Sequence, residues 1–300
     1  MKLFFKFFVI ITAIAFSMNS CQKEFTIEDD FNPPTDSTDN TDSIYIDRVF
    51  YFEETAAGLD TMWGYYFKYD DSKRVTEVYY NEDFPVNSYE LEHKYYYHGS
   101  DTIPYKTEEF DGASDNFPTE TFFTFDSQQR IIKDSIRHYN NSGVLDVLTV
   151  INYSYVPGEM YAHTRNTEYF DPTSPQEHIE LDTATLSSSG DIVSHKKYNE
   201  IGGVSFLINI SGFTYGTQAG PFSRSSIFKA HHLLPMGETF IEELMTYKNL
   251  LTQHEEDENG HVSMDVNFID YQYNSYGLVK EFRDPDPGFP MKVRFFYKAL

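Results

Sequence analysis

The sequence predicts an all-β protein, a large antiparallel up-and-down meander of about 16 to 20 strands that curls towards a barrel-like shape. Two observations carry this prediction: aromatic pairs followed by a turn residue recur along the chain, and helical periodicity is scarce. A third, a polar stretch before residue 44, sets the sheet apart from an N-terminal export segment. With no second linker in view, residues 44–300 are expected to form a single domain.

The repeated unit is two aromatic residues two positions apart, then Asp or Asn, three turn residues and an aliphatic opener. Its clearest copies begin at Phe67, Phe123 and Tyr271. Rings two positions apart lie on one face of a strand, and Asp or Asn favours a turn by bonding its own backbone. Each unit therefore predicts a β-hairpin. Looser copies run over 95–103, 139–145, 153–161, 186–192 and 198–204.

Glycines late in these turns indicate positive φ angles, namely Gly143, Gly190, Gly202 and Gly277. One segment is left undecided, because residues 239–251 fit both a helical stripe and a strand. Asn259-Gly260, just beyond it, predicts a hairpin tip.

The first twenty residues have the pattern of a secretory signal, with Lys2 and Lys6 around an apolar run that is too short for a membrane span. Cys21, the only cysteine, follows it and resembles the lipobox cysteine of bacterial lipoproteins, although Met18 and Asn19 depart from that motif. The resemblance implies a diacylglycerol on Cys21 and an anchor in outer-membrane lipid. The alternative is a free thiol, since one cysteine can form no internal disulfide.

Gln22, Lys23 and Glu24 resemble the tag that sends Bacteroidetes lipoproteins to the cell surface, with the periplasmic face as the alternative. Up to Ser43 the chain is polar and acidic and contains Pro33-Pro34, so residues 21–43 are expected to be a flexible tether. Cleavage after residue 20 removes two of the 23 basic residues and no acid. The mature chain then has 21 basic against 47 acidic residues, which excludes nucleic acid as a partner.

The aromatic-turn unit is similar to the YD-type repeats of bacterial surface proteins. Later landmarks are Phe213-Thr214-Tyr215, Gly220-Pro221-Phe222, Lys248-Asn249 and the hairpin from 271 to 282. Together they resemble a family of uncharacterised Bacteroidetes lipoproteins with a porin-like β fold. Gly220, Leu250, Leu278 and Val279 depart from the family's motifs. The resemblance implies a fold and no activity.

A membrane-spanning barrel is not expected. A lipid-facing strand needs an uncharged apolar face about ten residues long. Residues 131–139 place Lys133 and Arg137 on one face and Asp134 and His138 on the other, so neither face suits hydrocarbon.

The chain contains no nucleophile elbow, phosphate-binding glycine loop or His-Glu-x-x-His motif, so we predict no enzyme, no metal and no cofactor. His231-His232 is expected to be a surface pair. Residues 255–260 resemble half of a calcium loop, but Val266 stands where the bidentate acid belongs, which favours a solvated hairpin tip.

Two sets of residues are candidates for modification or binding. Asp-Ser/Thr-aliphatic triplets match a Bacteroidetes O-glycosylation site at Ser43, Thr61, Thr102, Ser135 and Thr183. Aromatic clusters that could stack on sugar rings are Trp63, Tyr65, Tyr66, Tyr95, Tyr96 and Tyr97, for which a core role is the competing interpretation.

These features predict a non-enzymatic, surface-tethered binding or structural module whose ligand is a glycan or another envelope protein. One alternative is a periplasm-facing carrier of a lipid or other apolar ligand. The other is a polysaccharide hydrolase that uses an acid pair.

Overall fold

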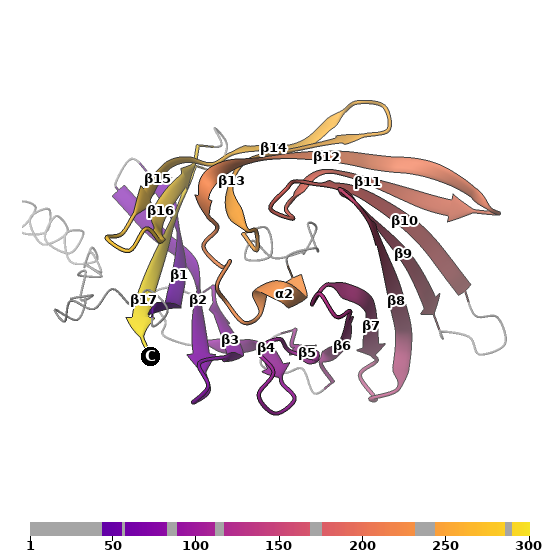
Figure 1. The fold of residues 1–300 in the computed structure, drawn as a ribbon, viewed down its shortest axis with the longest axis horizontal. Coiled ribbons are helices and arrows are strands. Elements are labelled where there is room, and N and C mark those ends of the chain that lie inside the picture. Colours follow the sequence, from indigo (N-terminus) through magenta and orange to yellow (C-terminus); the bar gives the residue numbers. More distant parts are fainter. Residues whose placement is uncertain are drawn as a thin grey trace, which may run out of the picture. The chain divides into compact units, whose positions relative to one another are not determined.

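The protein is described by a computed structural model over residues 44–55, 58–82, 89–111, 117–168, 176–231, 244–285 and 290–300. Its 17 strands form one antiparallel sheet that curls into a barrel (Figure 1). This confirms the predicted all-β meander and its number of strands. The strands are β1 (Ile44–Thr55), β2 (Gly58–Tyr69), β3 (Val75–Asn81), β4 (Glu90–Tyr96), β5 (Lys106–Glu109), β6 (Thr119–Phe125), β7 (Ile131–Tyr139), β8 (Leu145–Val156), β9 (Glu159–Glu168), β10 (Gln176–Leu186), β11 (Ile192–Ile201), β12 (Val204–Ala219), β13 (Lys248–Asp257), β14 (Val262–Asn267), β15 (Ile269–Tyr273), β16 (Val279–Asp284) and β17 (Met291–Ala299).

The first strand closes the ring, because β1 pairs with β2 along one edge and with β17 along the other. Further round the ring, β14 pairs with β13 and β15 pairs with β16, and only Phe268 separates β14 from β15. Counted as one interrupted strand, this pair reduces the 17 strands to 16 positions around the ring. An even number lets every neighbour be antiparallel when a meander closes.

The connections alternate between the two ends of the barrel. We call the end where β1 begins at Ile44 the tether end; it also holds the β2–β3, β6–β7, β10–β11 and β15–β16 turns. We call the opposite end, which holds the β7–β8, β11–β12 and β13–β14 turns, the mouth.

Six hairpin turns share one geometry. The first residue donates its N–H to the carbonyl four residues on, and the fourth donates back to the first; the turns are 70–74, 126–130, 140–144, 187–191, 257–261 and 274–278. In all but the fourth of these turns, a side-chain oxygen of the Asp or Asn accepts two further N–H groups. The fourth position has positive φ in each, including Lys73 at 64° and Gln129 at 61°. The predicted turns at Asp70, Asp126, Asn140 and Asn274 are confirmed.

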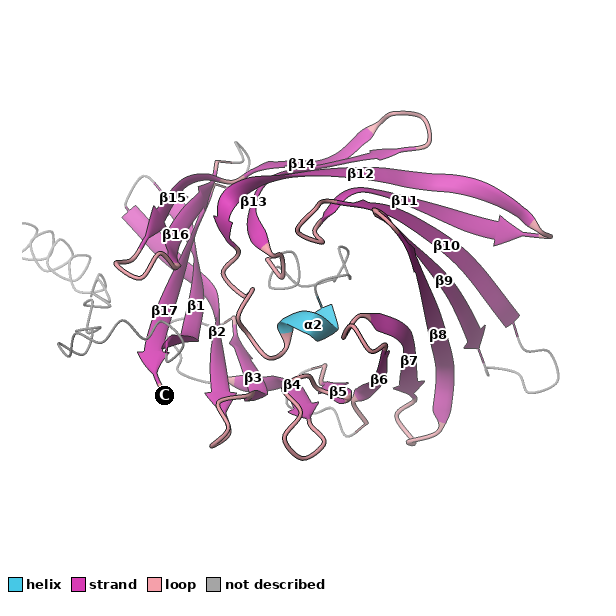
Figure 2. Ribbon diagram, in the orientation of Figure 1, coloured by secondary structure: helices cyan, strands magenta, loops and turns pink. Residues whose placement is uncertain are grey.

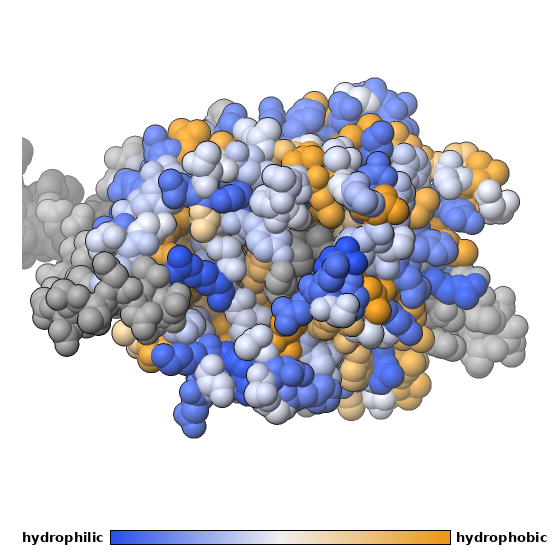
Figure 3. Space-filling view, viewed as in Figure 1, coloured by the Kyte–Doolittle hydropathy of each residue, from blue (hydrophilic) through white to orange (hydrophobic). Residues whose placement is uncertain are grey.

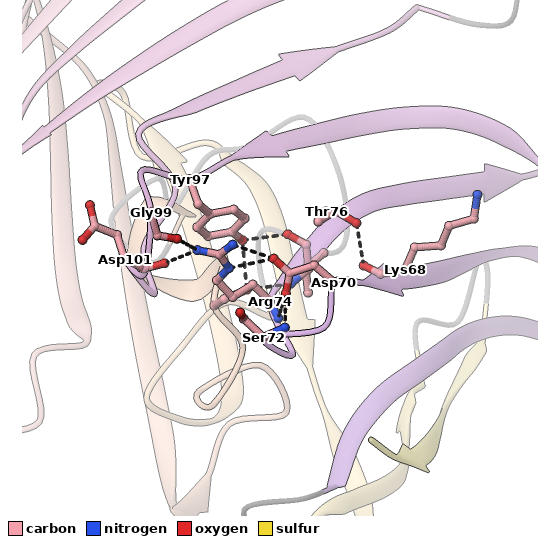
Figure 4. A network of polar contacts seen from close by, with 10 residues as sticks. Lys68, Asp70, Ser72, Arg74, Thr76, Tyr97, Gly99 and Asp101 are labelled. Carbon is pink, nitrogen blue, oxygen red and sulfur yellow. Dashed lines mark hydrogen bonds and ion pairs between the residues drawn. The ribbon is translucent and has the colours of Figure 1, made fainter.

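Arginines at the end of two turns join one hairpin to the next, and Figure 4 shows the first of them, Arg74. Arg74 Nε donates to Asp70 Oδ2 at 2.8 Å, and its guanidinium lies 4.6 Å from the centroid of the Tyr97 ring. Arg74 Nη1 also donates to two backbone carbonyls of the β4–β5 connection, those of Gly99 and Asp101. Arg130 repeats the arrangement with its own turn aspartate and the ring of a tyrosine on β8.

The turn at 126–130 makes the stability of the protein depend on pH through the carboxyl group of Asp126. Hydrogen bonds from the Arg130 backbone N–H and guanidinium lower the pKa of the Asp126 carboxyl. A lowered carboxyl pKa contributes stability that is fully present above the unfolded-state pKa of about 3.9 and is lost as pH falls through the folded-state pKa. Asp126→Asn keeps the turn acceptor, as Asn140 does naturally, but loses the charge. We expect the variant to be less stable than wild type at neutral pH and equally stable near about pH 2. Urea midpoints across this range test it, and a constant difference would contradict it.

Tyrosine hydroxyls form a second regular feature at the tether end, which we call the tyrosine ring. Each hydroxyl donates at 2.5–2.7 Å to a backbone carbonyl of the preceding strand in the ring: Tyr69 to Ile46, Tyr97 to Val75, Tyr155 to Ile131, Tyr215 to Ile192, Tyr271 to Leu250 and Tyr297 to Val279. Burial raises the pKa of all six, which keeps them protonated donors. The aromatic residue of the repeat thus ties adjacent strands together.

Removing one of these hydroxyls should have a measurable cost. We expect Tyr155→Phe to lower the free energy of unfolding by about 1 kcal/mol, because the Ile131 carbonyl loses its partner. Tyr161→Phe is the control, since that hydroxyl meets only Glu159 in an exposed pair, and its cost should stay within about 0.5 kcal/mol. Equal costs in urea unfolding would show that the ring contributes nothing specific.

The described residues between β12 and β13, 220–231 and 244–247, pack inside the barrel at the tether end, and we call them the plug. Its short helix α2 (Phe228–His231) lies within the ring of strands (Figure 2). Phe222 is 1% exposed, with its ring against those of Phe67 in β2 and Phe295 in β17. Ser226 Oγ accepts the Val75 N–H at 2.9 Å, so both sides of the plug's first segment are fixed to the wall.

The second plug segment is held by a buried carboxylate. Asp191, 3% exposed, accepts the Tyr247 N–H at 2.5 Å and the Ser189 hydroxyl at 2.9 Å. Burial raises the pKa of this carboxyl. The Gly220 N–H donates to the Tyr247 carbonyl at 3.0 Å, which joins the two segments.

Two details of the sequence prediction need revision. The unit at 198–204 does not turn at Asn199: β11 continues to Ile201, and Gly202-Gly203, with φ of 60° and 79°, make a tight two-residue turn. In the undecided segment, β13 begins at Lys248 and residues 244–247 belong to the plug, while 239–243 lie outside the described residues. Within the described ranges, no helix is long and apolar enough to cross a bilayer.

Candidate functional site

The inner wall of the barrel has two chemically different halves. From β17 to β3 it is aromatic and aliphatic and packs against the plug, with Tyr51, Tyr65, Phe67, Val78 and Phe295 among its buried residues. Across β10 to β13 it becomes polar, with Asp182, His195, Lys197, Ser211 and Gln253 on the same face as the core residue Ala184. We call this second half the polar wall.

Strand register arranges the polar wall in three rows. The deepest row is Ala184, His195, Ser211 and Glu255; the middle row is Asp182, Lys197, Asn209 and Asp257; the row nearest the mouth is Thr164, Glu180, Asn199 and Phe206. Directly opposed residues in an antiparallel pair have Cβ atoms about 4.5–5.5 Å apart, so each row is a line of neighbours.

The deepest row centres on a buried histidine. His195 is 2% exposed; its Nε2 lies 3.0 Å from Asp182 Oδ1, and its Nδ1 has no hydrogen-bond partner among the described residues. Ser211 donates to Glu255 Oε2 at 3.3 Å instead of to the imidazole. These residues therefore lack the hydroxyl–imidazole contact of a nucleophilic triad.

A second buried pair lies beside the middle row, because Tyr153 is opposite Ala162 and Ala162 is opposite Asp182. The Tyr153 hydroxyl donates to Asp134 Oδ2 at 2.8 Å. Burial, and then the negative charge of Asp134, raise the pKa of Tyr153 well above its ordinary value. Tyr153 is therefore a hydrogen-bond donor at any physiological pH.

The polar wall becomes accessible towards the mouth. Side-chain exposure is 3% at His195 in the deepest row, 27% at Lys197 in the middle row and 18% at Glu180 in the row nearest the mouth, and it reaches 44% at His178 beyond that row. Glu180 forms an ion pair with Lys197 at 3.1 Å, and its Oε1 also lies 3.1 Å from His178 Nε2. A ligand that enters from the mouth would meet these side chains before it reached the buried histidine.

The outer wall carries charged side chains on several of its strands. Lys106 lies between Glu108 and Glu120 at 2.8 and 2.5 Å, and Lys68 pairs with Glu77 at 3.1 Å. A lysine at the centre of a bilayer would cost roughly 2–4 kcal/mol on the lipid face of a barrel. Figure 3 shows hydrophilic side chains over much of the viewed face, with groups of hydrophobic side chains among them. These pairs place charged side chains on the outward face of β2, β3, β5 and β6.

The aromatic residues predicted to stack on sugars divide between the two faces of the sheet. Trp63, stacked on Tyr51 at 5.2 Å, packs against the core, as does Tyr97, and Tyr65 and Tyr95 are buried within it. Tyr66 and Tyr96 are half-buried on the outer face, where the Tyr96 hydroxyl donates to Glu108. Their predicted role as stacking residues stays a prediction.

The predicted modification sites differ in exposure. Thr102 is exposed in the β4–β5 connection, whereas Thr61, Ser135 and Thr183 lie within strands and are half-buried. Ser43, Cys21 and the tag Gln22, Lys23 and Glu24 lie outside the described residues. Lipidation and glycosylation stay predictions.

Sequence reasoning missed Phe206, Asn199 and Asn209. Asn199 was assigned to a turn, and the other two belong to no repeated unit. The available signal was the alternation of 195, 197 and 199, which places His, Lys and Asn on one face of a strand.

No family model and no curated protein matches the sequence. Among solved structures, the fold is similar to a porin-like protein from Bacteroides vulgatus ATCC 8482, with a TM-score of 0.50 and 8% identity over 85% of this chain and 99% of that chain. A porin-like protein from Bacteroides uniformis ATCC 8492 gives a TM-score of 0.44 and 9% identity over 84% of this chain and 98% of that one. At 8% identity the first likeness shows the fold alone, and that fold is porin-like.

Proposed function

We propose that this protein is an exported outer-membrane lipoprotein, held by acylated Cys21, whose barrel is a non-enzymatic binding module for a polar envelope ligand such as a glycan. The observation that carries the proposal is the polar wall, which runs from the accessible His178 to the buried His195 and ends on an imidazole nitrogen with no partner among the described residues. Buried polar groups that lack a partner are costly, and a ligand can supply the missing hydrogen bonds.

The segment that joins the proposed anchor to the barrel has enough residues to separate the two. The 22 residues between Cys21 and Ile44 can span roughly 75 Å when extended, enough to hold the domain clear of a membrane surface. Charged pairs on the outer wall, such as Lys106 with Glu108, support a barrel that stands in water beside the membrane. The resemblance of Gln22, Lys23 and Glu24 to an export tag supports the cell surface as its location.

The chemistry of the interior does not favour an apolar-ligand carrier. The apolar half of the wall is already covered by the plug through Phe222 and Phe228. An apolar ligand would have to lie on the other half, where it would cut off Asp182 and Lys197 from water without replacing their hydrogen bonds.

The test uses the lipidated protein purified from its own membrane. Wild type is expected to retain glycans on an array, and His195→Ala is expected to retain them more weakly. Silence of the wild type on both the array and pull-downs from envelope extracts would refute the proposal, and conversion of a bound glycan to shorter products would replace it with a hydrolase. If an epitope tag after Leu300 resists proteinase on intact cells, the protein faces the periplasm and the proposed surface location is wrong.

A further inference from the structure

We propose that the ligand is an uncharged, hydroxyl-rich carbohydrate, stacked on Phe206 at the mouth and hydrogen-bonded by Asn199, Asn209 and His195. This inference rests on the proposed function and names the ligand class and the residues that select it. Three independent features support it: an exposed aromatic platform, buried polar atoms that lack partners, and the charge balance of the wall.

The platform is presented by a rigid hairpin. The Gly202-Gly203 turn fixes Ile201 opposite Val204, and the resulting ribbon projects from the ring of strands (Figure 1). β12 pairs with β13 only from Asn209 onward, so the ribbon stands beyond the end of β13. Phe206 lies on this ribbon, directly opposite Asn199, and is 52% exposed. A half-exposed ring beside polar side chains offers an apolar surface to the C–H face of a sugar.

Two asparagine side-chain oxygens of the polar wall, one of them directly opposite this ring, have no hydrogen-bond partner among the described residues. The Oδ1 atoms of Asn199 and Asn209 are buried and accept no hydrogen bond from any described residue. Asn209 lies opposite Lys197, and Asn199 lies opposite Glu180, so both belong to the polar wall. An unsatisfied buried acceptor costs about 1–3 kcal/mol, which a ligand hydroxyl would recover by donating to it. Deeper in the wall, the buried His195 presents its unpartnered Nδ1.

The charge of the wall excludes an acidic sugar. Three carboxylates lie in the middle row and the row nearest the mouth, those of Glu180, Asp182 and Asp257. The one cation in these rows, Lys197, is paired with Glu180 at 3.1 Å. An anionic ligand would meet net negative charge in a partly buried site, where repulsion is weakly screened. Carboxylates only accept hydrogen bonds, so the wall as a whole favours a donor-rich, uncharged ligand.

The experiment compares neutral and anionic glycans on the full lipidated chain. Arrays of glucans, xylans, mannans and galactans are compared with galacturonans and sulfated glycans, and the Kd of the best neutral oligosaccharide is then measured by calorimetry. Phe206→Ala and Asn209→Ala are each expected to weaken binding about tenfold. Val262→Ala is the matched control, since Val262 is an equally exposed apolar residue, at 57%, on the neighbouring β13–β14 hairpin, and its Kd should not change.

The outcomes separate this inference from the proposed function. If both Phe206→Ala and Asn209→Ala still bind a neutral glycan strongly, the assignment of these residues as ligand contacts is wrong, while the proposed binding function remains. Binding restricted to anionic glycans would overturn the ligand class alone. If the protein binds no glycan but captures a protein from envelope extracts, the carbohydrate inference is overturned and the proposed binding function remains. If it binds nothing in either assay, both the inference and the proposed function are refuted.

Discussion

Replacing Phe222 with alanine is expected to lower the free energy of unfolding by about 3–5 kcal/mol. Phe222 is 1% exposed, and its ring contacts Phe67 in β2 and Phe295 in β17, so it joins the plug to two strands of the wall. Truncation removes this apolar contact and leaves a cavity that the surrounding strands, held in register by β1, cannot readily collapse. Urea unfolding followed by the fluorescence of Trp63, the only tryptophan, measures the loss.

Phe206→Ala is the matched control for this prediction. Phe206 is 52% exposed at the mouth, so its removal should change the free energy of unfolding by no more than about 0.5 kcal/mol. The pair therefore separates a structural phenylalanine from one proposed to bind ligand. A loss below about 1 kcal/mol for Phe222→Ala would mean that the plug is not packed into the barrel as described.

A single added methyl group at Gly220 is expected to cost about 1–3 kcal/mol. A Cβ at this position would lie 2.1 Å from the Thr246 carbonyl oxygen, a backbone atom that cannot rotate away. The Gly220 N–H also donates to the Tyr247 carbonyl at 3.0 Å, so moving the chain apart would break the bond that joins the two plug segments. The free energy of unfolding of Gly220→Ala measures this cost.

Gly212→Ala in β12 is the control, and it is expected to change the free energy of unfolding in the opposite direction. A Cβ there would meet no atom within 4 Å, so the variant should be stabilised by roughly 0.5–1 kcal/mol through the smaller entropy of its unfolded chain. Similar effects of the two substitutions would contradict the close approach of the plug to the end of β12.

The repeated units predicted the wall of the barrel because their signals are local. An Asp such as Asp70 shapes its own turn through neighbouring N–H groups, and paired aromatics such as Phe67 and Tyr69 lie on one face by the geometry of a strand. The plug could not be predicted in this way. Its contacts, such as Val75 with Ser226, join residues 151 positions apart and follow only from closure of the ring.

The candidate site was harder to predict than the fold for the same reason. Each of its rows combines residues from four strands, and single-residue bulges decide which side chains align, as between Lys197 and Tyr198. The repeat pattern assigned Asn199 to a turn, but the two glycines that follow moved the turn to the end of a longer strand. Trp63 and Tyr95 looked like binding residues because of their type, yet one packs against the core and the other is buried in it.

The central claim is that the face carrying Asn199 lies in a ligand-accessible mouth. Because Cys21 is the only cysteine and is predicted to be acylated, Asn199→Cys would introduce the single free thiol of the mature protein. We expect a small polar maleimide to label this thiol in the folded protein. A neutral oligosaccharide at 100 times its Kd should slow labelling about 100-fold. The control is Lys196→Cys, on the outward face of the same strand. Its thiol should react with the maleimide at the same rate with and without the oligosaccharide. An Asn199→Cys thiol that the maleimide cannot reach, or one that labels equally fast with saturating ligand, would contradict the account.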